Sequence, residues 1–499
     1  MRVLGKRVRN RGPRTAAGRP LVSRGVALAL AAGLLAALSL ASATAHAPGA
    51  PSADGRAADA PASLRGTKPN IVLVLTDDQT VESASKMPYL QSGVRQGRYI
   101  EFPNAEVNNS ICCPSRASIL TGQVDTRTGV INNTTGREQI KRSATVAVAL
   151  DRAGYRTALI GKLLNGYKPS WGGFPGWDVF EPLVKGVYRQ YDYTLLQDGR
   201  EVAYGSEPRD YGVDVLTERA DQFIRDTERD EPLFLYLAPT SGHVPWTAAP
   251  RHVDRHAHTP IPPIPSLNEA DVSDKPEWIR SLPPVNMNEQ NRIRRKQWDA
   301  ALGVDDLLRK VDRALADTGR SENTVVLFVS DNGLAMGEHR WFSKRCELRV
   351  CSEMLTYVRY PGVRGRVDPR LVTNLDFAPT FAALAGTEMS IQQDGVNLVP
   401  LLEDREAVRS SILLHWPGGS PDSVSSDMDT VTPGFYGVRT QRWRYVELET
   451  GERELYDQTE DPYELDNLLG PDSRVPRAHT ETVAELRAEL ARLKKASRS

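Results

Sequence analysis

Four short, continuous apolar runs constrain the fold of this chain more than any other feature of its sequence. They lie at residues 70–75, 156–160, 233–237 and 324–329. None of them alternates polar with apolar residues, which is typical of strands buried on both faces of a parallel sheet. Helical patterns lie between the runs, at residues 145–153, 213–226 and 291–316. Strands that alternate with helices predict an α/β fold with a large, mostly parallel central sheet flanked by helices.

The pattern changes after about residue 405. Residues 436–449 alternate as antiparallel strands do, and residues 480–495 carry a helical period. This indicates a smaller C-terminal α+β subdomain with an antiparallel sheet. We therefore expect the main α/β domain over residues 68–405 and the subdomain over residues 406–499.

The first 47 residues differ in composition from the rest of the chain. A start rich in arginine and lysine precedes an apolar run that ends near residue 40, and small residues follow at Ala45 and Ala47. This is typical of a secretory signal peptide, and the run is shorter than the roughly 20 residues that a spanning helix needs. Residues 48–67, rich in Ala, Pro, Ser and Gly, indicate a disordered linker. We expect a secreted protein with no membrane attachment once the signal is removed.

The charge balance of the chain limits its possible partners, and its cysteine content limits its possible disulfides. The chain has 63 basic and 63 acidic residues, so no net field favours nucleic acid or an anionic membrane. Anion recognition must therefore come from a local site. The chain has four cysteines, too few for a disulfide framework in a chain of this length. Cys346 and Cys351 could form a short disulfide or remain buried thiols, whereas a bridge between the adjacent Cys112 and Cys113 would be strained.

Acidic side chains follow two of the predicted strands. Asp77 and Asp78 come directly after the first run, and Asp331 and Asn332 follow the last one. Ligands of α/β sheets lie at the carboxyl ends of the strands, so we expect these side chains to converge. Clustered carboxylates repel one another without a cation, and hard oxygen ligands suit Ca²⁺ or Mg²⁺. The alternative is that each pair only forms a turn, since Asp and Asn-Gly are common in turns.

The segment that decides between these interpretations is Cys112-Cys113-Pro114-Ser115-Arg116, followed by Thr121-Gly122. It resembles the signature of the type I sulfatases, in which the first cysteine of Cys-x-Pro-Ser-Arg is oxidised to formylglycine (3-oxoalanine). By this resemblance Cys112 is the modified residue and Cys113 the variable position. The resemblance extends over nearly the whole chain after the linker, including Asp394-Gly395 and the closing segments near Asp457 and Asn467.

The family resemblance implies a fold, a cofactor and a maturation partner. The fold would be the alkaline-phosphatase-like sulfatase fold. The cation would be Ca²⁺, with Mg²⁺ as the alternative, held by Asp77, Asp78, Asp331, Asn332 and the modified Cys112. A formylglycine-generating enzyme would act on the chain during maturation.

The same resemblance assigns roles to cationic side chains and to one histidine. Lys162, in a Gly-Lys segment, would contact the sulfate, and Lys344 matches the second active-site lysine of the family. His243 and the Leu-Asn-Gly-Tyr after Lys162 are similar to segments of the N-acetylglucosamine-6-sulfatase branch. Many sulfatases have a histidine two residues after the lysine, but this chain has Leu164 at that position. The role that the histidine has in the family is therefore not assigned to any residue here.

These residues suit the hydrolysis of a sulfate ester. The anionic oxygens of the ester repel a nucleophile, so a divalent cation with Arg116, Lys162 and Lys344 would neutralise charge in the transition state. A hydroxyl of the hydrated aldehyde would attack sulfur, and the second hydroxyl would let sulfate leave by elimination. His243, or alternatively Lys344, would protonate the departing oxygen.

We therefore predict a sulfuric ester hydrolase acting on a sulfated carbohydrate, such as N-acetylglucosamine 6-sulfate, or on another sulfate ester. Two alternatives remain at this point. One is a phosphonate or phosphate ester hydrolase of the same fold, and the other is a secreted sulfoglycan-binding protein that lacks turnover. The walls of the substrate pocket would come from loops such as residues 171–193 and 260–288.

Overall fold

A large mixed sheet forms the centre of the computed structural model, which describes residues 64, 68–406, 409–419 and 431–498. Within these residues the sheet has nine strands in the order β2-β12-β9-β1-β8-β4-β5-β6-β7. The strands are β1 (Asn70–Thr76), β2 (Ile100–Glu101), β4 (Arg156–Gly161), β5 (Val179–Lys185), β6 (Tyr193–Gln197), β7 (Arg200–Tyr204), β8 (Leu233–Ala238), β9 (Thr324–Ser330) and β12 (Thr356–Arg359). The expected signal peptide lies outside the described residues, as does the expected linker apart from Leu64.

The five strands β9, β1, β8, β4 and β5 run parallel to one another. Four of them coincide with the four apolar runs, and every residue of β1, β8 and β9 is buried. Both faces of these strands are covered, which explains why their sequences do not alternate. The expected parallel core is confirmed, and antiparallel strands extend it at both edges.

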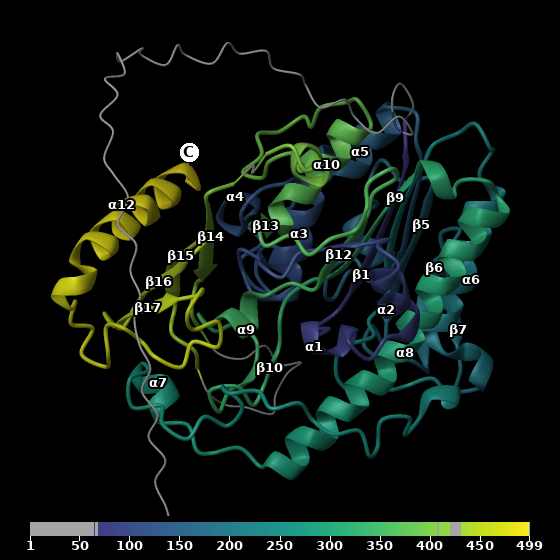
Figure 1. Cartoon of the computed structure of the whole chain (residues 1–499). Helices are drawn as coiled ribbons and strands as arrows, with labels where there is room; N and C mark the ends of the chain where they lie inside the picture. Colours follow the sequence, from purple (N-terminus) through teal and green to yellow (C-terminus); the bar gives the residue numbers. More distant parts are fainter. Residues whose placement is uncertain (1–63, 65–67, 407–408, 420–430, 499) are drawn as a thin grey trace, which may run out of the picture. The chain divides into compact units, whose positions relative to one another are not determined.

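Helices cover both faces of the sheet (Figure 1). Ile71 and Leu73 lie in one core with side chains of α3 (Cys112–Thr121), α5 (Val146–Arg152) and α10 (Phe377–Leu384). Val72 and Val74 point to the opposite face, against α1 (Val81–Ala84), α2 (Pro88–Arg95), α6 (Gly212–Asp226) and α8 (Met287–Asp317). Alternate residues of one strand thus serve two cores, as the strand period of two requires. No helix among the described residues has the length and apolar character needed to cross a bilayer.

A separate antiparallel sheet follows in the C-terminal part of the chain (Figure 1). Its order is β14-β15-β16-β17, formed by β14 (Ser411–Trp416), β15 (Phe435–Thr440), β16 (Trp443–Leu448) and β17 (Arg453–Asp457). One face packs against α12 (Thr480–Ala496), and the other contacts Ile111, the residue before Cys112. The expected antiparallel strands and terminal helix are confirmed, whereas a domain boundary at residue 405 stays a prediction.

The remaining elements are short. They are the strands β3 (Ala105–Glu106), β10 (Ala335–Met336), β11 (Phe342–Ser343) and β13 (Val372–Thr373) and the helices α4 (Asp125–Thr128), α7 (Glu277–Arg280), α9 (Arg349–Ser352) and α11 (Val399–Leu402). Strand β10 pairs with β11, and β13 with β3.

Buried ion pairs connect the C-terminal sheet to the rest of the fold. Glu106 of β3 accepts hydrogen bonds from Arg439 of β15, at 3.0 Å, and from Arg444 of β16. Arg444 also pairs with Glu464 at 2.8 Å. Burial alone would raise the pKa of Glu106, but the charges of Arg444 and Arg439 hold it below its usual value. Removing one partner of such a network leaves an uncompensated buried charge, which is strongly destabilising.

Two buried carboxyl groups, Glu347 and Glu454, also meet at this contact. Glu347 accepts a hydrogen bond from Trp278 Nε1 at 2.9 Å, and Glu454 accepts one from the Tyr456 hydroxyl at 2.6 Å. The second carboxyl oxygen of each group has no hydrogen-bond partner. Burial raises the pKa of Glu347 to about 7, and burial together with the charge of Glu347 raises the pKa of Glu454 well above its usual value. A shared proton is the simplest way to satisfy both groups.

This pair should make the protein more stable at mildly acidic pH. A carboxyl group whose folded pKa is raised stabilises the folded state below its unfolded pKa, near 4.5, and loses that contribution as the pH rises toward about 7. The unfolding free energy of the wild type should rise when the pH falls from 7.5 to 5. In Glu454→Gln we expect this rise to be smaller by about 2 kcal/mol. Urea unfolding at both pH values measures this, with the exposed Glu485→Gln as the control. An unchanged pH dependence in Glu454→Gln would contradict the shared proton.

Candidate functional site

Four parallel strands end at the same edge of the sheet, and a candidate site residue follows each of them. Asp77 and Asp78 follow β1, and Asp331 follows β9, which pairs with β1 in register from end to end. Lys162 follows β4, and the loop after β8 carries His243. The strand order therefore brings together side chains that lie far apart in the sequence.

Helix α3 presents two further candidates on one face. Cys112 is its first residue and Arg116 lies one turn later, so both side chains point to the same side. Cys113 points elsewhere: its sulfur packs in the core between the sheet and α3 and accepts the backbone N–H of Asn165 at 3.1 Å. The two cysteines therefore have different surroundings, and the assignment of Cys112, rather than Cys113, as the reactive position stays a prediction.

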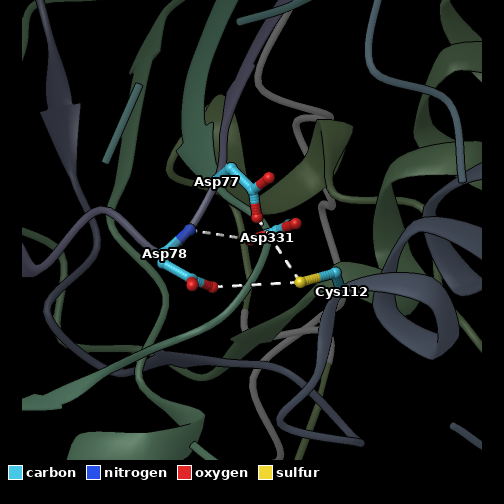
Figure 2. A group of neighbouring side chains, drawn as sticks. All are labelled: Asp77, Asp78, Cys112 and Asp331. Carbon is cyan, nitrogen blue, oxygen red and sulfur yellow. Dashed lines mark hydrogen bonds between the residues drawn. The ribbon is translucent and has the colours of Figure 1, made fainter. Parts of the chain in front are cut away.

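Three carboxylates and one thiol form a compact buried cluster (Figure 2). Asp77, Asp78, Cys112 and Asp331 each place a ligand atom within 4.8 Å of the others. The Cys112 sulfur lies 3.4 Å from Asp77 Oδ1 and 3.9 Å from Asp78 Oδ1. The backbone N–H of Asp78 donates to Asp331 Oδ1 at 3.1 Å, which ties the ends of β1 and β9 together.

Three cationic side chains neutralise the three carboxylates. Arg116 Nε donates to Asp331 Oδ2 at 2.7 Å, and Lys162 Nζ donates to Asp77 Oδ2 at 2.5 Å. Lys344 Nζ donates to Asp78 Oδ1 at 2.5 Å and to the Cys112 sulfur at 2.9 Å. All six charged side chains are buried. Because the charges balance, a divalent cation alone would add two uncompensated positive charges, and an anionic sulfate ester that binds with it would offset one of them.

Asn332 supplies an acceptor that suits a cation. Its Nδ2 donates to Asp78 Oδ1 and to the carbonyl of Gly333, each at 2.8 Å. Its Oδ1 is buried and has no hydrogen-bond partner. An unpartnered amide oxygen beside three carboxylates is a hard-oxygen donor set, which fits Ca²⁺ or Mg²⁺ better than a soft metal.

The buried charges perturb one another's pKa values. Burial would raise the pKa of Asp77, but the charge of Lys162 holds it well below its usual value. Burial and repulsion by Asp77 raise the pKa of Asp331 to about 6, although Arg116 opposes this. Burial would lower the pKa of Lys162 and of Lys344, but the neighbouring carboxylates hold both above their usual values. Both lysines are therefore charged across the physiological range.

His243 completes the ring of polar groups around Cys112. Its Nδ1 lies 2.7 Å from the carbonyl oxygen of Val244, and because a carbonyl only accepts, Nδ1 carries the proton. The other nitrogen, Nε2, faces Asp78 Oδ2 at 3.5 Å. Burial lowers the pKa of His243, although the carboxylates of Asp78 and Asp77 oppose that effect. Nε2 is thus the ring atom that faces the cluster.

A disulfide holds the segment that carries Lys344. Cys346 and Cys351 are bonded, which answers the question that the sequence left open. Cys351 lies in α9, and its carbonyl accepts the N–H of Gly333 at 3.1 Å, next to Asn332. The disulfide therefore links the Lys344 segment to the segment that carries Asp331 and Asn332.

The structure brings together every side chain that the sequence predicted for the site. These are Asp77, Asp78, Cys112, Arg116, Lys162, His243, Asp331, Asn332 and Lys344, all joined by the contacts above. Their chemical roles remain predictions.

Two residues that contact the site were not predicted. Gln297 of α8 donates to the carbonyls of Asp78 at 3.0 Å and Gly242 at 2.9 Å, and so holds the loops after β1 and β8 together. A polar residue on the buried face of a long amphipathic helix is the sequence signal that could have identified it. The second residue, Tyr188, stacks on His243 with ring centroids 4.0 Å apart, and no local pattern marks it.

Comparisons with known proteins agree with this geometry. The family model described as "Sulfatase" matches residues 69–387, and one described as "N-sulphoglucosamine sulphohydrolase, C-terminal" matches residues 337–496. The chain is 30% identical to N-acetylglucosamine-6-sulfatase of Homo sapiens over 449 residues, covering 80% of this chain and 81% of the relative. It is 26% identical to N-acetylglucosamine-6-O-sulfatase of Bacteroides thetaiotaomicron over 486 residues, covering 81% and 83%.

A solved structure shares the fold. It contains a protein in complex with its substrate D-glucosamine-2-N,6-O-disulfate, and it superposes with a TM-score of 0.73 at 24% identity, covering 86% of this chain and 98% of that one. The architecture expected from the sequence, a large central sheet with helices and a small C-terminal antiparallel sheet, is confirmed.

Proposed function

The chain belongs to the sulfatase family, and we propose that it hydrolyses the 6-sulfate ester of N-acetylglucosamine or of a closely related sulfated sugar. The observation that carries this proposal is the buried cluster in which Lys162, Lys344 and three carboxylates surround Cys112 at the first turn of α3. The two relatives named for N-acetylglucosamine-6-sulfatase activity support this choice of sugar.

We propose that Asp77, Asp78, Asp331 and Asn332 hold a calcium ion together with the modified side chain of residue 112. The unpartnered Asn332 Oδ1 and the three clustered carboxylates support this donor set. When bound, the cation would neutralise sulfate oxygens and favour ionisation of a hydroxyl at residue 112. Oxidation of Cys112 to formylglycine would supply that hydroxyl from the hydrated aldehyde, and a second hydroxyl through which sulfate leaves by elimination.

The remaining steps belong to side chains of the chain itself. Lys162 and Lys344 are charged and buried; Lys344 contacts the sulfur of Cys112, and Lys162 contacts Asp77 beside it. Both would bind the sulfate oxygens and stabilise charge as the ester bond breaks. Arg116 would hold Asp331 in place and add positive charge behind it. His243 would hold a proton at Nε2 and deliver it to the departing sugar oxygen, with Lys344 as the competing donor.

We propose that the protein acts outside the cytoplasm. The basic and apolar N-terminal pattern of residues 1–47 supports export. The Cys346–Cys351 disulfide supports it independently, because disulfides persist in oxidising compartments.

Substrate turnover tests the proposed function directly. Protein made together with a formylglycine-generating enzyme should release sulfate from N-acetylglucosamine 6-sulfate faster than phosphate from the 6-phosphate. Cys112→Ala should lower kcat about 10³-fold or more, because the nucleophile is lost. The matched control is Cys113→Ala, which removes the adjacent buried thiol and should keep most of the activity. Faster release of phosphate would instead indicate a phosphate ester hydrolase of the same fold.

Cation binding is tested by thermal unfolding with and without metal. After chelation, Ca²⁺ at about 100 times its Kd should stabilise the protein by about 3 kcal/mol, seen as a higher Tm. Asn332→Ala should weaken this binding by about tenfold or more, because one ligand is lost. The exposed Asp472→Asn serves as the control. If the Tm of the wild type did not respond to Ca²⁺ or Mg²⁺, the proposed cation site would be wrong.

The identity of the general acid is tested by changing the leaving group. A nitrophenolate leaves without a proton, whereas a sugar alkoxide needs one. His243→Ala should therefore lower kcat/KM about 10²-fold or more for the sugar sulfate, but less than about tenfold for nitrophenyl sulfate. Equal losses on both substrates would show that His243 does not act as the acid, and a leaving-group effect in Lys344→Ala would assign the role to Lys344.

A further inference from the structure

Tyr188 contacts two of the groups proposed to act on the sulfate ester, although it lies on a different part of the chain from either. It belongs to the loop between β5 and β6. Its ring stacks on the His243 imidazole with centroids 4.0 Å apart and an interplanar angle of 15°. The Lys162 ammonium lies 4.9 Å from the centroid of the same ring.

The loop that carries Tyr188 is firmly held. Gly186 has a φ of +60°, and a Cβ at this position would lie 2.8 Å from the carbonyl oxygen of Asp192, so the tight turn requires glycine. Gln190 is buried, and its Nε2 donates at 3.3 Å to the hydroxyl of Thr240 in the segment that leads to His243. The carbonyl of Gln190 also accepts the N–H of Gly212 at the start of α6. The Tyr188 loop and the His243 segment are therefore tied together at two points, the hydrogen bond and the ring stack.

His243 needs this second restraint. The hydrogen bond from Nδ1 to the Val244 carbonyl holds one edge of the imidazole. A flat aromatic ring parallel to the imidazole fixes its plane, and with it the direction of Nε2 toward Asp78. Proton transfer requires the donor within about 3 Å of the acceptor and well aligned, so the plane of the ring affects the rate of reaction.

We propose that Tyr188 is a positioning residue for the reaction: its ring holds the His243 imidazole in the orientation that directs Nε2 at the leaving group, and its contact with Lys162 keeps that ammonium against Asp77. This role rests on the proposed function of His243 and Lys162. The phenolic hydroxyl of Tyr188 is not needed for this positioning role. Burial raises the pKa of Tyr188 well above its usual value, with the charge of Asp77 adding to the effect, so the phenol stays neutral beside the cluster.

The test compares a variant that keeps the ring with one that removes it. Tyr188→Phe should keep kcat within about threefold of the wild type, because it retains the stack. Tyr188→Leu keeps an apolar side chain but removes the ring, and should lower kcat about 10- to 100-fold with a much smaller change in KM for the sugar sulfate. Tyr191→Leu is the matched control: Tyr191 lies on the same loop but packs against Tyr211, so kcat should not change. Unchanged Tm values would show that the variants are folded.

A second readout does not depend on turnover. The protons of a histidine ring that lies over an aromatic ring shift upfield in the NMR spectrum. With selectively labelled histidine and His243→Ala for assignment, the His243 signals should be shifted upfield in the wild type and in Tyr188→Phe, and should return toward ordinary values in Tyr188→Leu. If the wild type failed to cleave any sulfate ester, the proposed function would be wrong, and these shifts would still decide whether Tyr188 orients His243.

Two results would overturn the proposal. One is a Tyr188→Leu variant whose His243 signals match those of the wild type. The other is a Tyr188→Leu variant whose kcat is unchanged while its KM falls, which would make Tyr188 a cover over the site rather than a positioning residue.

Discussion

Strands β1 and β9 lie side by side and in register, with Thr76 opposite Ser330, and the arrangement of the site depends on this pairing. The next residues along the two strands are Asp77 and Asp331, so two carboxylates emerge at adjacent positions on one edge of the sheet. Their repulsion must be compensated in a buried site. The neighbouring strand β4 supplies Lys162, and α3 supplies Arg116. The cationic side chains therefore compensate these buried carboxylates in the folded protein.

The same balance of charge supports the proposal that a sulfate ester is hydrolysed at this site. Three carboxylates and three cationic side chains compensate one another inside the protein. A cation bound to the carboxylates would release the lysines, which could then hold the anionic ester. Preorganised charges of this kind need little rearrangement as the ester bond breaks, and this is the main source of electrostatic catalysis. The Cys346–Cys351 disulfide and the contact of Ile111 with the C-terminal sheet hold Lys344 and α3 in position from outside the cluster.

Much of this could be predicted from the sequence, because the signals are local. The continuous apolar runs identified β1, β4, β8 and β9, and the acidic residues after β1 and β9 pointed to one edge of the sheet. Other features depend on tertiary contacts that no local pattern reveals. Strand β5 contains Pro182 and a mixed sequence, so neither it nor the hairpin of β6 and β7 was predicted. The contact of Tyr188 with His243 and the pairing of Glu347 with Glu454 likewise join segments far apart in the chain.

We propose that residue 112 acts as an aldehyde rather than as a thiol. The most direct measurement is the mass of the proteolytic peptide that contains residue 112, from protein produced together with a formylglycine-generating enzyme. We expect a mass about 18 Da below that of the unmodified cysteine peptide, because the thiol has been oxidised to an aldehyde. An intact thiol in protein that hydrolyses sulfate esters would contradict it, since the nucleophile would then have to be a different group.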